Sequence, residues 1–197
     1  MRCLGRWGVG KTSLDDIARE AGCSRASVYR TFPGGKESLL REVAAQEVRT
    51  FFEAIDSRLR AEASLESMLT AGVEEALLRL RDHEALTFLA EFEPDRLSLA
   101  PSASGIGRVL PPGVAFTAAH LRRFVPAAVA GEAAEWVVRV VLSYAAAPPL
   151  TIPAGPEHPG RIVKALLVPA IAALAEAAGA PLHATATSTA PVAAAVR

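Results

Sequence analysis

The stretch that decides the fold is Thr12-Ser-Leu-Asp-Asp-Ile-Ala-Arg-Glu-Ala-Gly22-Cys-Ser-Arg-Ala-Ser-Val-Tyr-Arg-Thr-Phe32, followed by Pro33-Gly-Gly35. Its first Thr and Asp have capping-box spacing, which predicts a helix that starts near Ser13 and ends at Gly22. Ser24 is placed to cap a second helix, which the Pro-Gly-Gly run ends. Two short helices joined by a glycine turn predict a helix-turn-helix unit.

The second helix of this unit has a polar face that packing between two helices does not explain. Ala18 is small enough for the helices to approach, and Val28 fills the seam between them. The other side carries side chains that can bond bases or phosphates. These are Arg25, Ser27, Tyr29, Arg30 and Thr31. The pattern indicates a helix that enters a groove of DNA.

With Lys36-Glu-Ser-Leu-Leu40 after them, these residues resemble the DNA-binding signature of the TetR family of transcriptional regulators, including the Tyr29-x-x-Phe32 pair. The resemblance is dense over residues 12–43, and beyond them it extends only to architecture. It implies an all-α fold, with an N-terminal helix-turn-helix DNA-binding domain followed by an all-helical ligand-binding and dimerisation domain.

We expect the DNA contacts to come from this head. Arg25 and Ser27, near the start of the second helix, are the candidate base readers. The candidate phosphate contacts are Tyr29, Arg30, Thr31 and Lys36, together with Thr12 and Ser13 at the N-terminus of the preceding helix. Charge agrees with this, since residues 1–36 carry seven Lys and Arg against three Asp and Glu, a net of +4 in a chain of net charge +0.

A second motif competes for the same region. Gly5-Arg-Trp-Gly-Val-Gly10-Lys11-Thr12 fits G-x-x-x-x-G-K-[ST], the phosphate-binding loop of nucleotide hydrolases. Only Met1 to Leu4 precede it, too few for the strand that delivers such a loop, so we expect a Gly-rich turn after one turn of helix. The family begins with a complete first helix, so either the chain start is truncated or the head lacks one wall, and we expect truncation.

Apolar spacing at three and four residues predicts helices through the rest of the chain, separated by proline and glycine. The expected helices are 36–60, 65–80, 86–92, 114–126, 131–147 and 159–178, the last kinked at Pro169, with a long loop over 94–113. We divide the chain into a DNA-binding domain (1–43), a helical effector-binding and dimerisation domain (44–179) and a disordered tail (180–197).

Site candidates in the second domain follow from the resemblance. For the effector pocket they are Phe88, Phe92, Phe116, His120 and Phe124, with Arg122 and Arg123 available for an acidic group and an apolar ligand favoured. For a homodimer interface built from the last two helices they are Val138, Val141, Ile162, Leu166, Ile171 and Leu174. Aromatic residues at helical spacing also fit plain core packing.

The expected function is a ligand-responsive repressor that binds a palindromic double-stranded DNA operator as a homodimer. Two alternatives stay open: a nucleotide-binding enzyme that uses Gly5 to Thr12, and a helical oligomer without DNA binding. The four His and two Cys show no metal-ligand spacing. No catalytic residues, cofactor or metal are proposed, and without a signal peptide or membrane span we expect a cytoplasmic protein.

Overall fold

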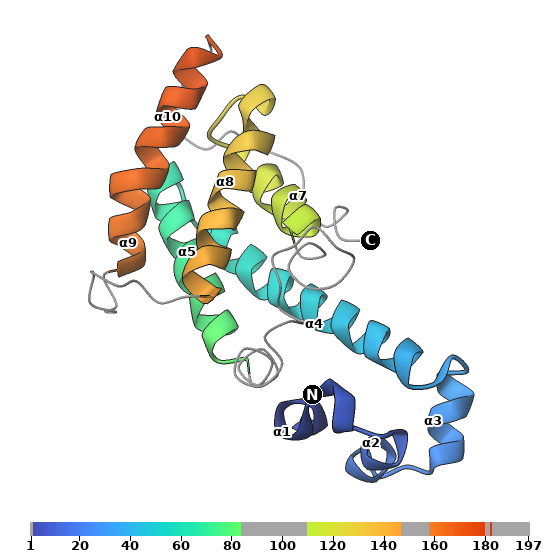
Figure 1. Cartoon of the computed structure of the whole chain (residues 1–197). Coiled ribbons are helices and arrows are strands. Elements are labelled where there is room, and N and C mark those ends of the chain that lie inside the picture. The colour runs from blue at the N-terminus through green and yellow to red at the C-terminus, as the bar shows by residue number, and fades with distance from the viewer. Residues whose placement is uncertain (1, 84–109, 147–157, 180–181, 183–197) are drawn as a thin grey trace.

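The computed structural model describes residues 2–83, 110–146, 158–179 and 182. Within these residues every regular element is a helix, so the predicted all-α fold is confirmed. The helices α1 (Arg2–Lys11), α2 (Leu14–Glu20) and α3 (Arg25–Thr31) gather at the N-terminal end of the long α4 (Gly35–Arg60), as Figure 1 shows. The remaining helices form a body at the other end of α4.

Those remaining helices are α5 (Leu65–Arg81), α7 (Leu110–Leu121), α8 (Ala127–Ala146), α9 (His158–Ile162), a π-helical turn η3 (Val163–Leu167) and α10 (Val168–Ala177). Two separate hydrophobic cores follow from this layout. A small one holds Leu14, Ala18, Val28 and Leu39, and a large one is shared by α4, α5 and α7 to α10. Because α4 contributes to both, it is the rigid connection between the head and the body.

The turn between α2 and α3 has the geometry that its glycine predicts. Gly22 has a φ of 65°, a backbone conformation that costs glycine little and other residues more. The N–H of Cys23 donates to the Ala18 carbonyl and that of Gly22 to the Arg19 carbonyl, at 2.9 and 3.2 Å. This is a Schellman cap, which satisfies the last carbonyls of α2 and sets the path into α3.

The first helix differs from the prediction. In place of one turn and a Gly-rich loop, α1 runs from Arg2 to Lys11 and breaks only at Gly8, where φ is 73° and ψ is 173°. Cys3 is buried against α2, with its thiol 3.9 Å from the Asp16 carbonyl oxygen. Tertiary packing therefore overrides the low helix propensity of the glycines, and the head has three helices.

Two boundaries in the body lie earlier than expected. α7 begins at Leu110 rather than near 114, because Pro111 and Pro112 fall in the first turn, where backbone N–H groups have no helical partner. α8 begins at Ala127 rather than 131, with the N–H groups of Val129 and Ala130 donating to the Pro126 carbonyl. The prediction placed these prolines in a loop or at the end of a helix, whereas in the structure Pro111 and Pro112 lie in the first turn of α7 and Pro126 directly precedes α8.

The last helix is irregular where Pro169 predicted a kink. The N–H of Val168 donates to the Val163 carbonyl, five residues back, so the helix widens into η3 one turn before the proline. A π-turn relieves the clash between a proline ring and the preceding turn. The predicted helix 86–92, residues 94–109 of the predicted loop and the tail, apart from Leu182 against the large core, lie outside the described residues.

Candidate DNA-binding interface and effector cavity

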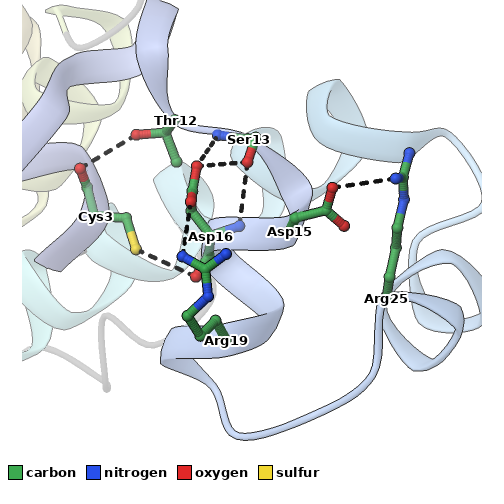
Figure 2. A network of polar contacts seen from close by, with 7 residues as sticks. All are labelled: Cys3, Thr12, Ser13, Asp15, Asp16, Arg19 and Arg25. Carbon is green, nitrogen blue, oxygen red and sulfur yellow. Dashed lines mark hydrogen bonds and ion pairs between the residues drawn. The ribbon is translucent and has the colours of Figure 1, made fainter.

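The N-terminus of α2 is closed by its own side chains (Figure 2). The Ser13 hydroxyl accepts from the Asp16 N–H at 3.1 Å, and the Ser13 N–H donates to the Asp16 carboxylate at 3.0 Å. The Ser13 hydroxyl and N–H hold the pKa of Asp16 below its usual value. A DNA phosphate at Ser13 would meet this carboxylate, so the structure does not favour the predicted phosphate contact there.

Thr12, a predicted phosphate contact, is buried inside the head. Its side chain is 1% exposed, and its hydroxyl lies 2.6 Å from the Gly8 carbonyl oxygen and 3.2 Å from that of Cys3. Its N–H also donates to Gly8. Thr12 therefore joins the end of α1 to its start, on the inner side of the Gly8 break.

The same contacts bear on the nucleotide-loop alternative. Gly5 to Lys11 of the motif lie in α1 and not in a loop after a strand, and the hydroxyl of Thr12, which would bind magnesium, is bonded inside the head. The Thr12 N–H donates to the Gly8 carbonyl at 3.3 Å, which closes a helical turn. The geometry is that of a structural helix.

The recognition helix α3 presents a polar face to solvent. Val28 is buried in the small core, while Arg25, Tyr29, Arg30 and Thr31 are exposed and Ser27 is half-buried. The hydroxyl of Ser24 caps α3 by accepting from the Ser27 N–H at 3.1 Å. The predicted set is thus brought together on one short helix.

Arg25 is held in place by two neighbours. Its Nη1 donates to Oδ2 of Asp15 on α2 at 3.1 Å, and its guanidinium lies 5.4 Å from the Tyr29 ring centroid. The Tyr29 hydroxyl and then Asp15 raise the pKa of Arg25 above its ordinary value. The guanidinium is therefore charged and oriented along the exposed face of α3 before any DNA binds.

Lys36 lies at the start of α4, half-buried, and its ammonium donates to the Gly10 carbonyl at the end of α1, at 3.3 Å. An ammonium has three N–H donors. One of these N–H donors therefore bonds α4 to α1, and the other two are available for a phosphate.

A cavity of about 420 Å³ lies along the inner side of α4. Its described walls come from α4, α5, α7 and α8, and Val9 of α1 reaches it from the head. The predicted pocket residue Phe116 lines it. Phe88 and Phe92 lie outside the described residues.

Two other predicted pocket residues, His120 and Phe124, are buried in the core and are not among the described residues that line this cavity. The ring of His120 packs 4.8 Å from that of Phe116, and its Nε2 lies 3.0 Å from Oδ1 of Asp56. Arg123, proposed for an acidic ligand group, donates to the Leu59 and Glu62 carbonyls at 2.9 and 2.6 Å. Arg122 is exposed and outside the described lining.

Residues 1–43 match the family model described as bacterial regulatory proteins, tetR family. The head is a TetR-family DNA-binding domain. This confirms the resemblance read from the residues of α2 and α3. No curated protein sequence matches the chain.

Solved regulators, two of them described as TetR-family proteins, share the fold over most of the chain. A putative regulator from Mesorhizobium loti MAFF303099 superposes with a TM-score of 0.61 at 22% identity, covering 88% of this chain and 91% of that one. The repressor AlkX from Dietzia sp. strain DQ12-45-1b, implicated in n-alkane biodegradation, gives 0.58 at 22% identity, covering 85% and 86%. FadR from Bacillus halodurans, a fatty acid degradation regulator, gives 0.52 at 17% identity, covering 88% and 92%.

Residues 1–43 thus match the DNA-binding domain of a family of bacterial regulatory proteins, and the described chain shares its all-helical fold with solved regulators. Among the described helices, none has the length and apolar character needed to cross a membrane. In the same part of the chain, no group of three His, Cys, Asp or Glu is placed to hold a metal ion.

The predicted dimer residues separate into three groups by their exposure. Ile162 and Ile171 are 3% exposed and lie in the protomer's own core. Val138, Val141 and Leu174 are half-buried, the two valines facing the cavity. Leu166, at 57% exposed, is the member of the set that faces outward.

Three functional candidates were missed from the sequence. Trp136 is 63% exposed on α8 and belongs with Leu166 as an outward apolar side chain. Asp15 is the partner of Arg25, and Val9 links the cavity to the head. A signal for the cavity was present in α4, where Phe51 next to Phe52 makes the apolar face wider than one core stripe needs.

Proposed function

We propose that the chain is a ligand-responsive repressor that binds a palindromic operator as a homodimer. The observation that carries the proposal is the exposed face of α3, where Arg25, Tyr29, Arg30 and Thr31 project from a helix held rigidly on α2. Arg25 and Ser27, at the N-terminal end of α3, are placed to reach base edges. Tyr29, Arg30, Thr31 and Lys36 are the proposed phosphate contacts.

A homodimer follows from the outer face of the last two helices. Trp136 on α8 and Leu166 on η3 are large apolar side chains exposed to solvent. Beside Leu166, the exposed positions of the last helix are mainly small and apolar: Ala165, Pro169, Ala170 and Ala173. Two copies packed through this face form a four-helix bundle that covers it. The two-fold axis then places two copies of α3 about 34 Å apart, or a multiple of it, in successive major grooves.

Ligand response follows from the position of the cavity on α4. The helix that forms one wall of the cavity continues without interruption into the small core of the head through Leu39. A ligand that favours a head separation unsuited to successive grooves lowers DNA affinity by its differential binding free energy.

The test of the DNA and dimer parts is selection of bound fragments from random DNA, combined with sedimentation of the free protein. The chain is expected to enrich an inverted repeat and to sediment as a dimer at micromolar concentration. Leu166→Glu is expected to give monomers with much weaker operator binding, because a charge would be buried unpaired at the interface. The matched control is Leu78→Glu on α5, where the parent leucine is 55% exposed.

A monomeric parent, or a dimeric Leu166→Glu variant with full operator affinity, would contradict the dimer. The nucleotide-binding alternative has its own assay. ATP titration of the parent and of Lys11→Ala is expected to give no saturable binding for either protein. Saturable binding to the parent that is lost in Lys11→Ala would show that Gly5 to Thr12 binds nucleotide and would overturn the proposed function.

A further inference from the structure

We propose that the cavity along α4 binds an uncharged, elongated and mainly apolar molecule, and that one end of this ligand contacts α1 of the DNA-binding head. The proposal rests on the ligand response proposed above and names the chemistry of the ligand. It depends on the shape of the cavity, the state of the charged groups in its wall and the presence of Val9.

The wall of the cavity is apolar along its length. On α4 the lining runs from Leu40 through Phe51 and Phe52 to Leu59. Across from it lie Met68, Leu69, Val73 and Ala76 on α5, Phe116 on α7 and Val137, Val138 and Val141 on α8. Burying hydrocarbon here is favourable because it removes apolar surface from water.

The cavity is long and narrow. Leu40 and Leu59 both line it, and 19 residues of helix at about 1.5 Å each extend about 28 Å. A volume of about 420 Å³ distributed along this length leaves little width at any point. A chain-like molecule therefore fills it better than a compact polycyclic one of the same size.

The charged groups in the wall already have partners. Nε2 of His83 lies 3.4 Å from Oε2 of Glu47, and Nε of Arg79 lies 2.6 Å from Oε1 of Glu75. A charged ligand group would have to separate one of these pairs or remain without a counter-charge among the described lining residues. Either is costly in an apolar site, so a neutral ligand is favoured. Thr117, also in the lining, offers a hydroxyl to one neutral polar group such as an alcohol.

At its head-side end the cavity is lined by a residue of the DNA-binding domain. Val9 is the residue of α1 in the described lining, and it shares this end with Leu40, Val43 and Ala44 of α4. Val9 follows the break at Gly8, and the next residue, Gly10, accepts the hydrogen bond from Lys36. A ligand that fills this end presses directly on the segment that joins α1 to α4.

The test uses four C10 probes on the purified full chain: 1-decanol, decanoate, decyltrimethylammonium and the bicyclic alcohol 2-decalol. Calorimetric titration is expected to show decanol binding at least 10-fold more tightly than each of the other three. Tighter or equal binding of decanoate or of the ammonium probe would overturn the neutral assignment. Equal binding of 2-decalol would overturn the elongated shape, and no binding of any probe would overturn the site.

Two variants locate the binding site. Val141→Phe adds volume at the α8 wall of the cavity, and Ala44→Phe fills its head-side end from a position where the parent side chain is exposed. Each is expected to weaken decanol binding at least 10-fold, while Leu78→Phe, outside the described lining, leaves it unchanged. Ala44 is exposed, so Ala44→Phe is expected to fold and remains a usable test even if Val141→Phe does not fold. Unchanged affinity in folded Ala44→Phe would contradict occupation of the head-side end.

The DNA readout separates failure of this inference from failure of the proposed function. Sequence-specific DNA binding without decanol binding would leave the regulator in place and overturn the ligand inference. Decanol binding by a chain that shows no sequence-specific DNA binding would leave the cavity assignment and overturn the regulator.

Discussion

Nη1 of Arg25, at the start of the recognition helix, lies 3.1 Å from Oδ2 of Asp15 on the preceding helix. This pair orients the proposed base reader and also competes with DNA for it. Both side chains are more than half exposed, so the pair itself contributes little to stability. Its importance is for binding, since Arg25 has to exchange a carboxylate for DNA.

Asp15→Asn is expected to raise affinity for DNA of any sequence by about 2- to 5-fold, because it removes a competitor for Arg25 and a negative charge near the phosphates. Fluorescence anisotropy with operator and scrambled duplexes measures the change. The control is Glu20→Gln, which removes the same charge from the head at a carboxylate paired with Arg2 at 2.6 Å. Equal gains in DNA affinity in the two variants would show that the change in net charge, and not the release of Arg25, causes the effect.

Lys36→Ala is expected to weaken binding to all sequences alike and to reduce the slope of log K against log salt by about 1, as loss of one phosphate contact does. Titrations at several salt concentrations measure the slope, with Lys164→Ala on η3 as the control. If Lys36 only joins α4 to Gly10, the slope will match the parent and the loss will appear in the free energy of unfolding.

Thr12→Val is expected to lower the free energy of unfolding by about 1–3 kcal/mol, because it removes a buried hydroxyl that lies within hydrogen-bonding distance of two carbonyls. Thr12→Ser keeps the hydroxyl and is expected to lose less. Urea unfolding measures both. The salt dependence of DNA binding by folded Thr12→Val should equal that of the parent, and a reduced salt slope with full stability would restore the phosphate role.

His120 is expected to make stability depend on pH. Burial lowers its pKa from the ordinary value, which outweighs the opposite effect of Asp56, while Arg123 and Arg60 lower it further. The folded state therefore favours neutral His120. Its contribution is fully present above about pH 6.5, where the unfolded histidine is also neutral, and is lost as the pH falls towards the lowered folded pKa.

Urea unfolding at several values between pH 5 and 8 measures this dependence. His120→Gln, which stays neutral throughout, is expected to flatten it below pH 6.5. The same decline in parent and variant would assign the effect to other groups.

The head could be predicted from sequence because its signals are local. Gly22, Ser24 and Val28 each determine a turn, a cap or a contact within a few residues, and the structure has the predicted α2, turn and α3. The capping box of α2 is Ser13 with Asp16, one residue later than the predicted pair Thr12 and Asp15. Thr12 could not be placed, because its burial depends on α1 continuing through the glycines, which is a tertiary effect.

The burial of residues in the body was harder to predict, because it too depends on tertiary packing. Helical spacing predicted α4 and α5 to within one residue, yet a periodic apolar pattern does not say what each face contacts. Ile171 and Leu166 lie on the same irregular helix and both read as interface residues, but the first is in the protomer's core and the second in solvent. The widening of the helix at η3 changes which side chains face outward, and only the structure shows it.

The measurement that tests the central claim most directly is the ratio of Kd values for a scrambled duplex and for the selected inverted repeat, at physiological salt. For sequence-specific recognition by α3, the parent chain is expected to give a ratio of at least about 10³. Arg25→Ala should reduce operator affinity by about 1–3 kcal/mol and relax preference at one base pair in each half-site. Equal affinity of the parent for the two duplexes, or an Arg25→Ala variant with unchanged preference at every position, would contradict the account.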